Sequence, residues 1–296
     1  MAWADFGRSD ELFGLVTLVA DNVLLSDDQA KKQILEKNAG SDAREIILIG
    51  DRIFRIVLDR LSQLVGENVN SKSIAIVPLV YTYSHQGAYS KNLLFGLLYW
   101  LFSGSDEEVQ TKKIALSANR GRFESVLSAC KADITAIASR KGGGFKSTKD
   151  IAGVISQIVE KLTRGGDLTT EQAIENVINE LSLKPVPPHI TFGRTASPKQ
   201  RSQINISSLL ERAPICPICK GYINLESGKQ YDHHFERFAE VRRTSTDNMR
   251  PTHPFCNNMR DQINEIKGQA SKLSIPSLPV APQDVMSDKR QLLFVF

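Results

Sequence analysis

Four residues in the C-terminal part of this chain have the types and the spacing of a tetrahedral zinc site. They are Cys216, Cys219, His253 and Cys256. Structural zinc sites take four nitrogen or sulfur ligands, commonly as two pairs from separate chain segments with two or three residues inside each pair. The pattern therefore predicts a structural Zn²⁺. The alternative, a redox-active or simply buried pair of Cys216 and Cys219, leaves His253 and Cys256 without a role.

A second set of polar residues lies between and beside these ligands, namely Asp232, His233, Asn248 and Asn257. Hydrolysis of a phosphodiester needs a general base to activate water and a cation to offset charge on the phosphate. Imidazole suits the first task, and carboxylate and amide oxygens hold the hard cations Mg²⁺ and Mn²⁺. Asn257 directly follows one zinc ligand. We therefore expect zinc to fix a helix against a hairpin and to place Asn257 opposite Asp232.

The order of these residues along the chain is specific. A predicted strand ends in Asp232-His233, a loop leads to Asn248 on a returning segment, and a predicted helix carries Cys256-Asn257 with a basic residue, Arg260, three positions later. In this order, residues 213–267 resemble the HNH (ββα-metal) endonuclease family. The resemblance implies a small ββα module that cleaves DNA.

The family resemblance also implies a role for each polar residue. His233 would be the general base that deprotonates water. Asp232 and Asn257 would hold a catalytic Mg²⁺ or Mn²⁺. Asn248 would hydrogen-bond across the hairpin and fix the loop that carries His233.

The chain departs from the family pattern after the Asp-His pair, where His234 replaces the usual aliphatic residue. Successive residues of a strand face opposite sides, so only one of the two histidines can face the metal. We favour His233 as the base, because Asp232 then has a use. With the register shifted by one residue, His233 would be the metal ligand and His234 the base, an arrangement similar to colicin-type DNases.

Three arginines near this pattern are candidate contacts to nucleic acid. Arg242 and Arg243 replace the glycines that the family usually has in its loop, and Arg260 follows the closing Cys-Asn pair. Arginines in such places bind phosphates and position the backbone without reading the sequence. Solvated surface arginines are the alternative for Arg242 and Arg243.

The elements that must position these residues are mainly helical, and the predicted fold class is mainly α. Capping boxes predict helix starts at Ser105 with Glu108 and at Thr169 with Gln172. The segment Ser73 to Tyr83 is β-branched and aromatic but contains Pro78, so it fits a short strand or a buried helix entry. Helices are predicted over 11–25, 27–37, 43–65, 91–102, 106–117, 122–138, 148–162 and 170–183; apolar spacing in the third of these predicts one broad buried stripe.

Composition and charge suggest two domains with different partners. We expect a helical domain over 1–183, a Pro-rich linker over 184–207, the zinc-stabilised HNH domain over 208–272 and an irregular tail over 273–296. Residues 186–296 hold 15 Lys and Arg against 10 Asp and Glu, and the rest of the chain is nearly neutral. A basic module suits a polyanionic partner such as DNA. No signal peptide or membrane span is predicted, so the cytoplasm is the expected compartment, and Cys130 is expected to be a buried core residue.

The helical part has a weaker resemblance of its own. The order of its segments SIAIVPLVYTYS, SKNLLFGLLYWLF and ANRGRFESVLSA is similar to the helical region that precedes an HNH domain in GmrSD-type modification-dependent restriction proteins. That resemblance implies restriction of foreign DNA together with a separately encoded partner subunit. A homodimer is the expectation for cutting both strands, because one HNH site hydrolyses one strand; two successive nicks are the alternative. A free-standing homing-type nuclease is the alternative, and a zinc-stabilised nucleic-acid-binding module without catalysis is another.

Overall fold

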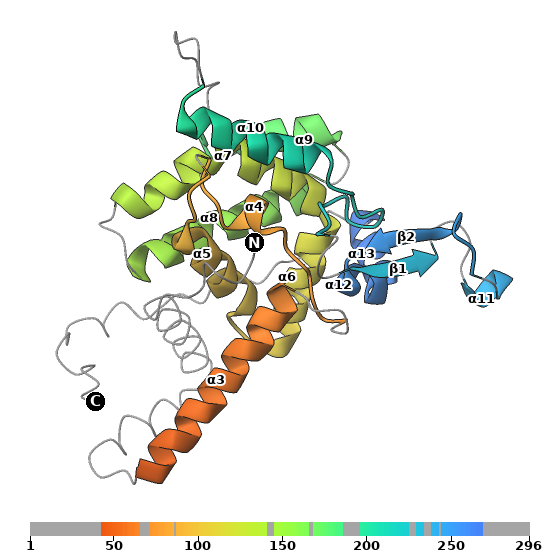
Figure 1. Ribbon diagram of the computed structural model, residues 1–296, viewed down its shortest axis with the longest axis horizontal. Helices are drawn as coiled ribbons and strands as arrows, with labels where there is room; N and C mark the ends of the chain where they lie inside the picture. The colour runs from red at the N-terminus through yellow and green to blue at the C-terminus, as the bar shows by residue number, and fades with distance from the viewer. Residues whose placement is uncertain are drawn as a thin grey trace.

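The computed structural model describes residues 43–65, 71–85, 87–140, 145–165, 168–185, 196–224, 229–233, 238–242 and 244–268. In this part of the chain the protein is mainly helical, with one two-stranded antiparallel sheet (Figure 1). The elements in chain order are α3 (Ala43–Val65), α4 (Pro78–Tyr81), α5 (Lys91–Phe102), α6 (Asp106–Ala118), α7 (Arg120–Arg140), α8 (Phe145–Arg164), α9 (Thr170–Glu180), α10 (Pro198–Glu211), β1 (Gln230–His233), α11 (Phe238–Val241), β2 (Met249–Thr252), α12 (Pro254–Asn258) and α13 (Arg260–Gly268). The helices predicted over 11–25 and 27–37, and the tail after 272, lie outside the described residues.

The helix starts follow the local chemistry of the sequence. Both predicted capping boxes are present: the Ser105 side chain accepts from the Glu108 backbone, and the Thr169 side chain accepts from that of Gln172. Each glutamate or glutamine side chain in turn accepts from the capping residue's backbone N–H. The box therefore satisfies donors that a helix start would otherwise leave unpaired. α5 is apolar on all sides, and every residue from Leu93 to Phe102 is buried, as expected for a helix at the centre of a core.

The ambiguous segment before α5 enters a helix rather than forming a strand. α4 begins at Pro78, the position where a helix tolerates proline because no backbone N–H is needed there. The residues before it are buried and run along the end of α3, where the backbone of Ile74 donates to Gln63 and that of Ile76 to Leu64.

The prediction for α3 holds only for its C-terminal part. Val57 and Leu64 are buried, at 1% and 0% exposure, whereas Phe54 and Leu58 are 43% and 50% exposed. The prediction of one continuous buried stripe is therefore wrong at these two positions. The cause is geometric: α3 extends away from the other described helices, so only its last turns reach the core (Figure 1).

Part of the predicted linker is also helical. α10 begins at Pro198 with Ser197 as its cap, in a third capping box that is closed by Gln200. The remaining described residues of the predicted linker, 184, 185, 196 and 197, lie in neither a helix nor a strand. One of the four prolines on which the linker prediction rested, Pro198, is the first residue of a helix.

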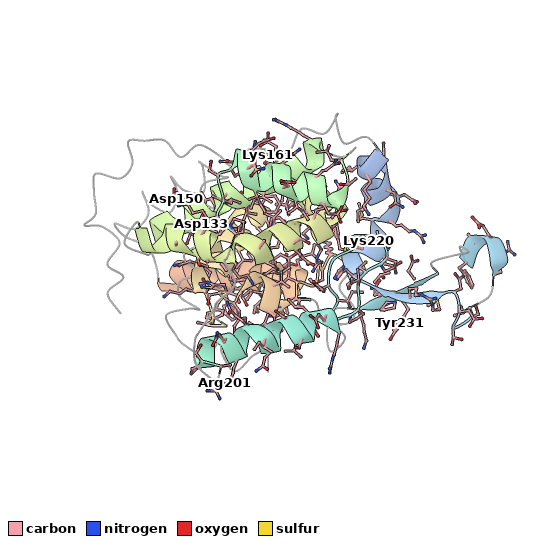
Figure 2. The ribbon with its side chains drawn as sticks, turned by 90° about the horizontal axis from the view of Figure 1, so that it is seen from above. Asp133, Asp150, Lys161, Arg201, Lys220 and Tyr231 are labelled. Atoms are coloured by element: carbon pink, nitrogen blue, oxygen red, sulfur yellow. The ribbon has the colours of Figure 1, made fainter. Side chains whose placement is uncertain are left out.

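The metal-binding segment shares its core with the helices. Its buried residues Cys216, Ile218 and Phe255 belong to one continuous hydrophobic cluster together with Trp100 and Phe123. Cys130 is fully buried in the same cluster, as predicted. The β1–β2 hairpin, in contrast, projects from the helices, with Tyr231 on its exposed side (Figure 2).

One buried lysine links the two parts of the core. The Lys113 ammonium lies 5.6 Å from the ring centroids of Phe102, in α5, and Phe255, in α12. Burial lowers the pKa of Lys113 to about 8. The side chain donates to Gln63 and to the backbone of Lys72, so its polar head is satisfied inside the core. In the part of the chain that the structure describes, no helix is both long and apolar enough to cross a bilayer.

Candidate metal centre and the adjoining hairpin

The first ligand pair sits on a tight knuckle. The Cys216 N–H donates to the Gly221 carbonyl, and the Lys220 N–H donates back to the Cys216 carbonyl, each at 2.9 Å. The chain turns through Lys220, whose φ of +62° lies in the left-handed region. Gly221 is needed for a different reason: a Cβ there would lie 2.6 Å from Cγ of Arg120. The knuckle can therefore approach α7 closely only with glycine at this position.

The second ligand pair is placed by a helix start. His253 is the N-cap of α12, Pro254 is the first helical residue, and Cys256 follows in the first turn. The Asn257 N–H donates to the His253 carbonyl at 3.0 Å, which closes that turn. The i, i+3 spacing of the pair on a helix start is as predicted. A further hydrogen bond, from the Phe255 N–H to the Ser73 carbonyl, ties this turn to the segment before α4.

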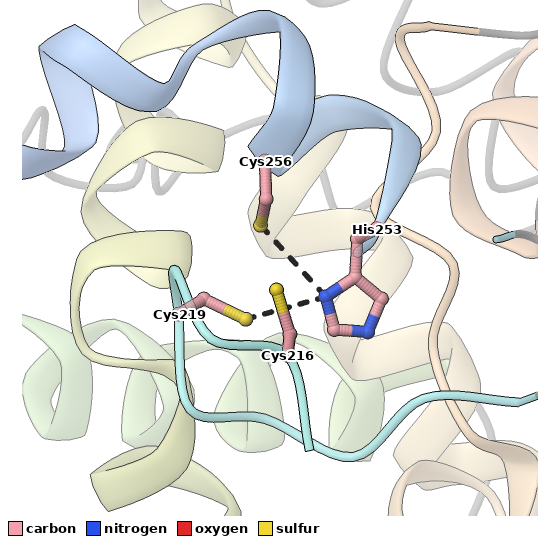
Figure 3. A group of neighbouring side chains, drawn as sticks. All are labelled: Cys216, Cys219, His253 and Cys256. Atoms are coloured by element: carbon pink, nitrogen blue, oxygen red, sulfur yellow. Dashed lines mark hydrogen bonds between the residues drawn. The ribbon is translucent and has the colours of Figure 1, made fainter. Parts of the chain in front are cut away.

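The four predicted ligands converge (Figure 3). Their ligand atoms lie within 4.8 Å of one another, and none of the side chains is more than 1% exposed. His253 Nδ1 is 3.2 Å from Cys219 Sγ and 3.8 Å from Cys256 Sγ. Two ligands of a tetrahedral zinc ion are about 3.5 Å apart when the bonds are 2.0–2.3 Å long. The buried cluster of three cysteines and one histidine could therefore bind a metal such as zinc, in agreement with the prediction.

The electrostatics of the cluster also favour a cation. Burial raises the pKa of Cys219, and its neighbour Cys216 raises it further. Hydrogen bonding to Cys216 and Cys219 likewise raises the pKa of Cys256 well above its ordinary value. Burial acts to raise the pKa of Cys216 too, but hydrogen bonds from its three neighbours bring it below the ordinary value. Without a metal the protein therefore stabilises one thiolate here, whereas a divalent cation would ionise all three thiols.

A layer of hydrogen bonds behind the ligands orients the histidine. His253 Nε2 lies 2.9 Å from the Tyr222 carbonyl. Because a carbonyl can only accept, Nε2 carries the hydrogen and Nδ1 is left to bind a metal. The Tyr222 N–H in turn donates to Glu124 Oε2 at 2.8 Å. The histidine is thus connected, through the backbone of one residue, Tyr222, to a carboxylate on α7.

Glu124 belongs to a buried ionic group that sequence reasoning missed. Its Oε1 accepts from Arg120 Nε and from the Tyr81 hydroxyl, each at 2.8 Å, and both charged side chains are 1% exposed. The Arg120 guanidinium also donates to the carbonyls of Ile74 and Ala75. The only available signal was the Arg-x-x-x-Glu spacing at the start of a helix that is otherwise well buried. That spacing is common on solvated helix surfaces and does not indicate burial.

The hairpin that carries the other candidate residues has the predicted topology. β1 pairs antiparallel with β2, so that Gln230 faces Thr252, Asp232 faces Arg250 and His233 faces Met249. Gln230 and Asp232, two residues apart, share one face of the strand. That face looks toward α12 and α13, because Asn257 donates to Gln230 at 3.1 Å and Arg260 donates to Asp232 at 2.8 Å.

The structure thus brings Asp232 and Asn257 to the same side of the hairpin, but each is bonded to another side chain. Arg260, which was predicted to contact nucleic acid, binds the Asp232 carboxylate through one oxygen, Oδ2. Asn248 is buried just before β2. Arg242 is exposed in a left-handed conformation at φ +50°. The side chain of His233, and all of His234 and Arg243, lie outside the described residues.

Comparison of the chain with protein-family models, with curated proteins and with solved structures finds no match in any of the three.

Proposed function

We propose that this protein is a metal-dependent DNA endonuclease of the HNH type. One observation carries the proposal: a two-stranded antiparallel hairpin leads directly into a short helix whose start supplies half of a metal cluster. Asp232 and Asn257 lie on the facing sides of that hairpin and helix. The excess of basic residues over 186–296 supports a polyanionic substrate.

In the proposed site zinc has a structural role and a second cation a chemical one. The carboxylate of Asp232 and the side-chain oxygen of Asn257 form a hard donor set that fits Mg²⁺ or Mn²⁺. Such a cation supplies charge neutralisation at the scissile phosphate. His233 takes the proton from the attacking water, and Asn248 holds the turn that leads into β2. Arg260 must leave Oδ2 of Asp232 for both oxygens of that carboxylate to be available to a cation, and a DNA phosphate is a suitable alternative partner for its guanidinium.

The experiment is a nicking assay on supercoiled plasmid with the full, zinc-loaded chain and added Mg²⁺ or Mn²⁺. We expect wild type to nick the plasmid, and His233→Ala to slow nicking by about 100-fold or more, the usual contribution of a general base. The control His85→Ala removes a histidine that lies outside the hairpin and should cleave as wild type does. Zinc content and thermal melting should be the same in all three proteins.

One observation favours a second function, a zinc-stabilised nucleic-acid-binding module without catalysis. The Asp232–Arg260 ion pair occupies the carboxylate on which the proposed cation depends. If the second function is correct, binding of the wild-type chain slows the migration of DNA in a gel, with an affinity that falls steeply with salt. The plasmid nevertheless stays supercoiled with either cation.

Running the same assay on modified and unmodified plasmids separates a modification-dependent restriction role from a homing-type one.

A further inference from the structure

A cavity of about 420 Å³ lies where the zinc knuckle meets the helices. The starts of α7 and α9 and the last turn of α13 border it, together with the ends of α6 and α8. Figure 2 labels Lys220 at this junction of the helices with the metal-binding segment. The cavity is separate from the hairpin face that carries Asp232 and Asn257, because neither strand contributes to its lining. Its volume suits a ligand the size of a mononucleotide.

Positive charge prevails among the residues that line the cavity. Arg122, Lys220 and Lys267 come from three different segments, α7, the knuckle and α13. Among the described residues that line the cavity, Glu124 alone carries a carboxylate, and both of its oxygens are already engaged, with Arg120, Tyr81 and the Tyr222 N–H. Three cations therefore face a carboxylate whose charge is already balanced by Arg120.

The cations still have donors to offer. Arg122 uses Nη2 for the Leu168 carbonyl at 3.1 Å, which is one contact for a group with five N–H donors. Lys267 donates to the Ile218 carbonyl, which holds its ammonium beside the knuckle, and an ammonium has three donors. Lys220 is exposed at the tip of the knuckle. One guanidinium and two ammonium groups in the lining of a single cavity offer suitable partners for a phosphate.

The rest of the lining offers an apolar surface. Ile215, which is 56% exposed, and Ile266 line the cavity together with the aromatic side chain of Tyr222. A flat ring next to aliphatic side chains is a favourable surface on which a planar heterocycle can stack. A ligand that satisfies both sides of the cavity is anionic at one end and planar and apolar at the other.

We propose that this cavity binds a phosphate-bearing small molecule of the nucleotide class. Its phosphate contacts Arg122, Lys220 and Lys267, and its base packs against Tyr222 and the two isoleucines. Tyr222, whose carbonyl orients His253, lines the cavity, so the ligand would contact the support of the metal cluster rather than the proposed catalytic face. The proposal does not rest on nuclease activity, because binding is measured without DNA and without added Mg²⁺.

The test is isothermal titration calorimetry of the full, zinc-loaded chain with three probes: adenosine 5′-monophosphate, adenosine and inorganic phosphate. We expect the monophosphate to bind at least about tenfold more tightly than adenosine, because the difference is a set of charge-assisted hydrogen bonds. It should also bind more tightly than inorganic phosphate, since the base adds packing against Tyr222.

Two variants place the phosphate in the cavity. Lys220→Asn removes one charge with a residue that tolerates the left-handed backbone at that position, and Arg122→Gln removes another. Each should weaken the monophosphate about five- to tenfold and leave adenosine unchanged. The matched control Lys184→Asn neutralises an exposed lysine that does not line the cavity and should bind as wild type does. Zinc content should stay the same in all variants.

Four results would overturn the proposal. They are no heat of binding from the monophosphate at millimolar concentration, equal affinity for the monophosphate and adenosine, equal affinity for the monophosphate and inorganic phosphate, and unchanged affinity in both cavity variants.

A single-stranded oligonucleotide serves as a fourth probe. If it binds through Lys220 and Arg122 while the monophosphate does not, the cavity receives a strand backbone instead of a small molecule. The nuclease proposal and this one can be tested separately. His233→Ala, which should slow the proposed nicking, should still bind the monophosphate as wild type does.

Discussion

The cysteine–histidine cluster and the hairpin beside it contain candidate metal ligands of opposite character. In the cluster four ligand atoms converge within 4.8 Å, all four side chains are buried, and the histidine tautomer is held by a peptide carbonyl. At the hairpin Asp232 is 13% exposed and its partner Arg260, in α13, is 22% exposed; Oδ2 of Asp232 accepts from Arg260, and the Asn257 amide nitrogen donates to Gln230. The cluster is preorganised for an ion, whereas the hairpin needs a rearrangement of side chains before it could hold one.

The difference follows from the chemistry of the ligands. Buried thiols are weak hydrogen-bonding groups, so a fold can bring three of them together without strong polar partners. A metal ion then stabilises their ionised form. A carboxylate that is largely buried needs a counter-charge within the folded protein, and here the Arg260 guanidinium supplies it. A tightly built zinc site beside a self-neutralised carboxylate is thus the expected resting arrangement when one ion is structural and another is exchangeable.

The largest effect should come from breaking the cluster itself. Cys256→Ser replaces a thiolate ligand with a hydroxyl that stays protonated, so zinc content should fall from one equivalent per chain to almost none. Because the free energy of zinc binding contributes to folding, and because Phe255 beside it lies in the common core, we expect a loss of several kcal/mol, on the order of 5, in unfolding free energy. Metal analysis and chemical denaturation measure the two quantities.

Cys130 provides a matched control for this change. It is equally buried, at 0% exposure, but lies outside the cluster. Cys130→Ser should cost about 1–3 kcal/mol for burying a hydroxyl and should leave the zinc content at wild-type level. If Cys256→Ser and Cys130→Ser lose the same stability and both keep zinc, the cluster is an ordinary part of the core and the comparison with the hairpin has no basis.

A smaller effect is expected from the group behind the cluster. Glu124→Gln keeps the shape of the side chain but leaves the buried Arg120 guanidinium without its counter-charge, which should lower unfolding free energy by about 3–5 kcal/mol. It also weakens the hydrogen bond from the Tyr222 N–H, and the carbonyl of the same residue orients His253. Loss of such an outer partner typically lowers metal affinity by about 10–100-fold. Competition with a chromophoric chelator measures the affinity.

Tyr81→Phe separates the two consequences of that change. It removes one hydrogen bond to the same carboxylate but leaves the contact between Glu124 and the Tyr222 N–H in place. We expect a modest loss of stability, about 1 kcal/mol, with zinc affinity unchanged. Equal zinc affinity in Glu124→Gln and wild type would mean that α7 supports the fold but does not support the metal.

Sequence reasoning succeeded where spacing alone determines geometry. The ligand pairs at 216 and 219 and at 253 and 256 needed only a knuckle and a helix start, and both are local structures. The capping boxes at Ser105 and Thr169 are local in the same sense. These features depend on residues within five positions of one another, so tertiary packing had little opportunity to change them.

It failed where distant segments decide the outcome. The Arg120–Glu124 pair is buried because the knuckle and the segment before α4 cover it. The sequence around the two residues gives no indication of this burial. Phe54 and Leu58 are exposed because the rest of the described fold covers only the end of α3. Asp232 meets Arg260 because a strand and a helix 28 residues apart are packed together. Each of these depends on which surfaces meet, and periodicity in one segment does not contain that information.

The smallest and sharpest test concerns that last contact. Arg260→Gln frees the Asp232 carboxylate from its ion pair while leaving the cysteine–histidine cluster untouched. If Asp232 and Asn257 form a site for a hard cation, Mn²⁺ should bind the zinc-loaded variant about two- to fivefold more tightly than wild type, in keeping with the modest energy of a partly exposed ion pair. Electron paramagnetic resonance of free Mn²⁺ measures this directly. The double variant with Asp232→Asn should lose the gain, because the ligand itself is then gone. Unchanged Mn²⁺ affinity in both proteins would mean that the pair is a fixed part of the hairpin's packing, and the hairpin would then be a surface for binding and not a site for chemistry.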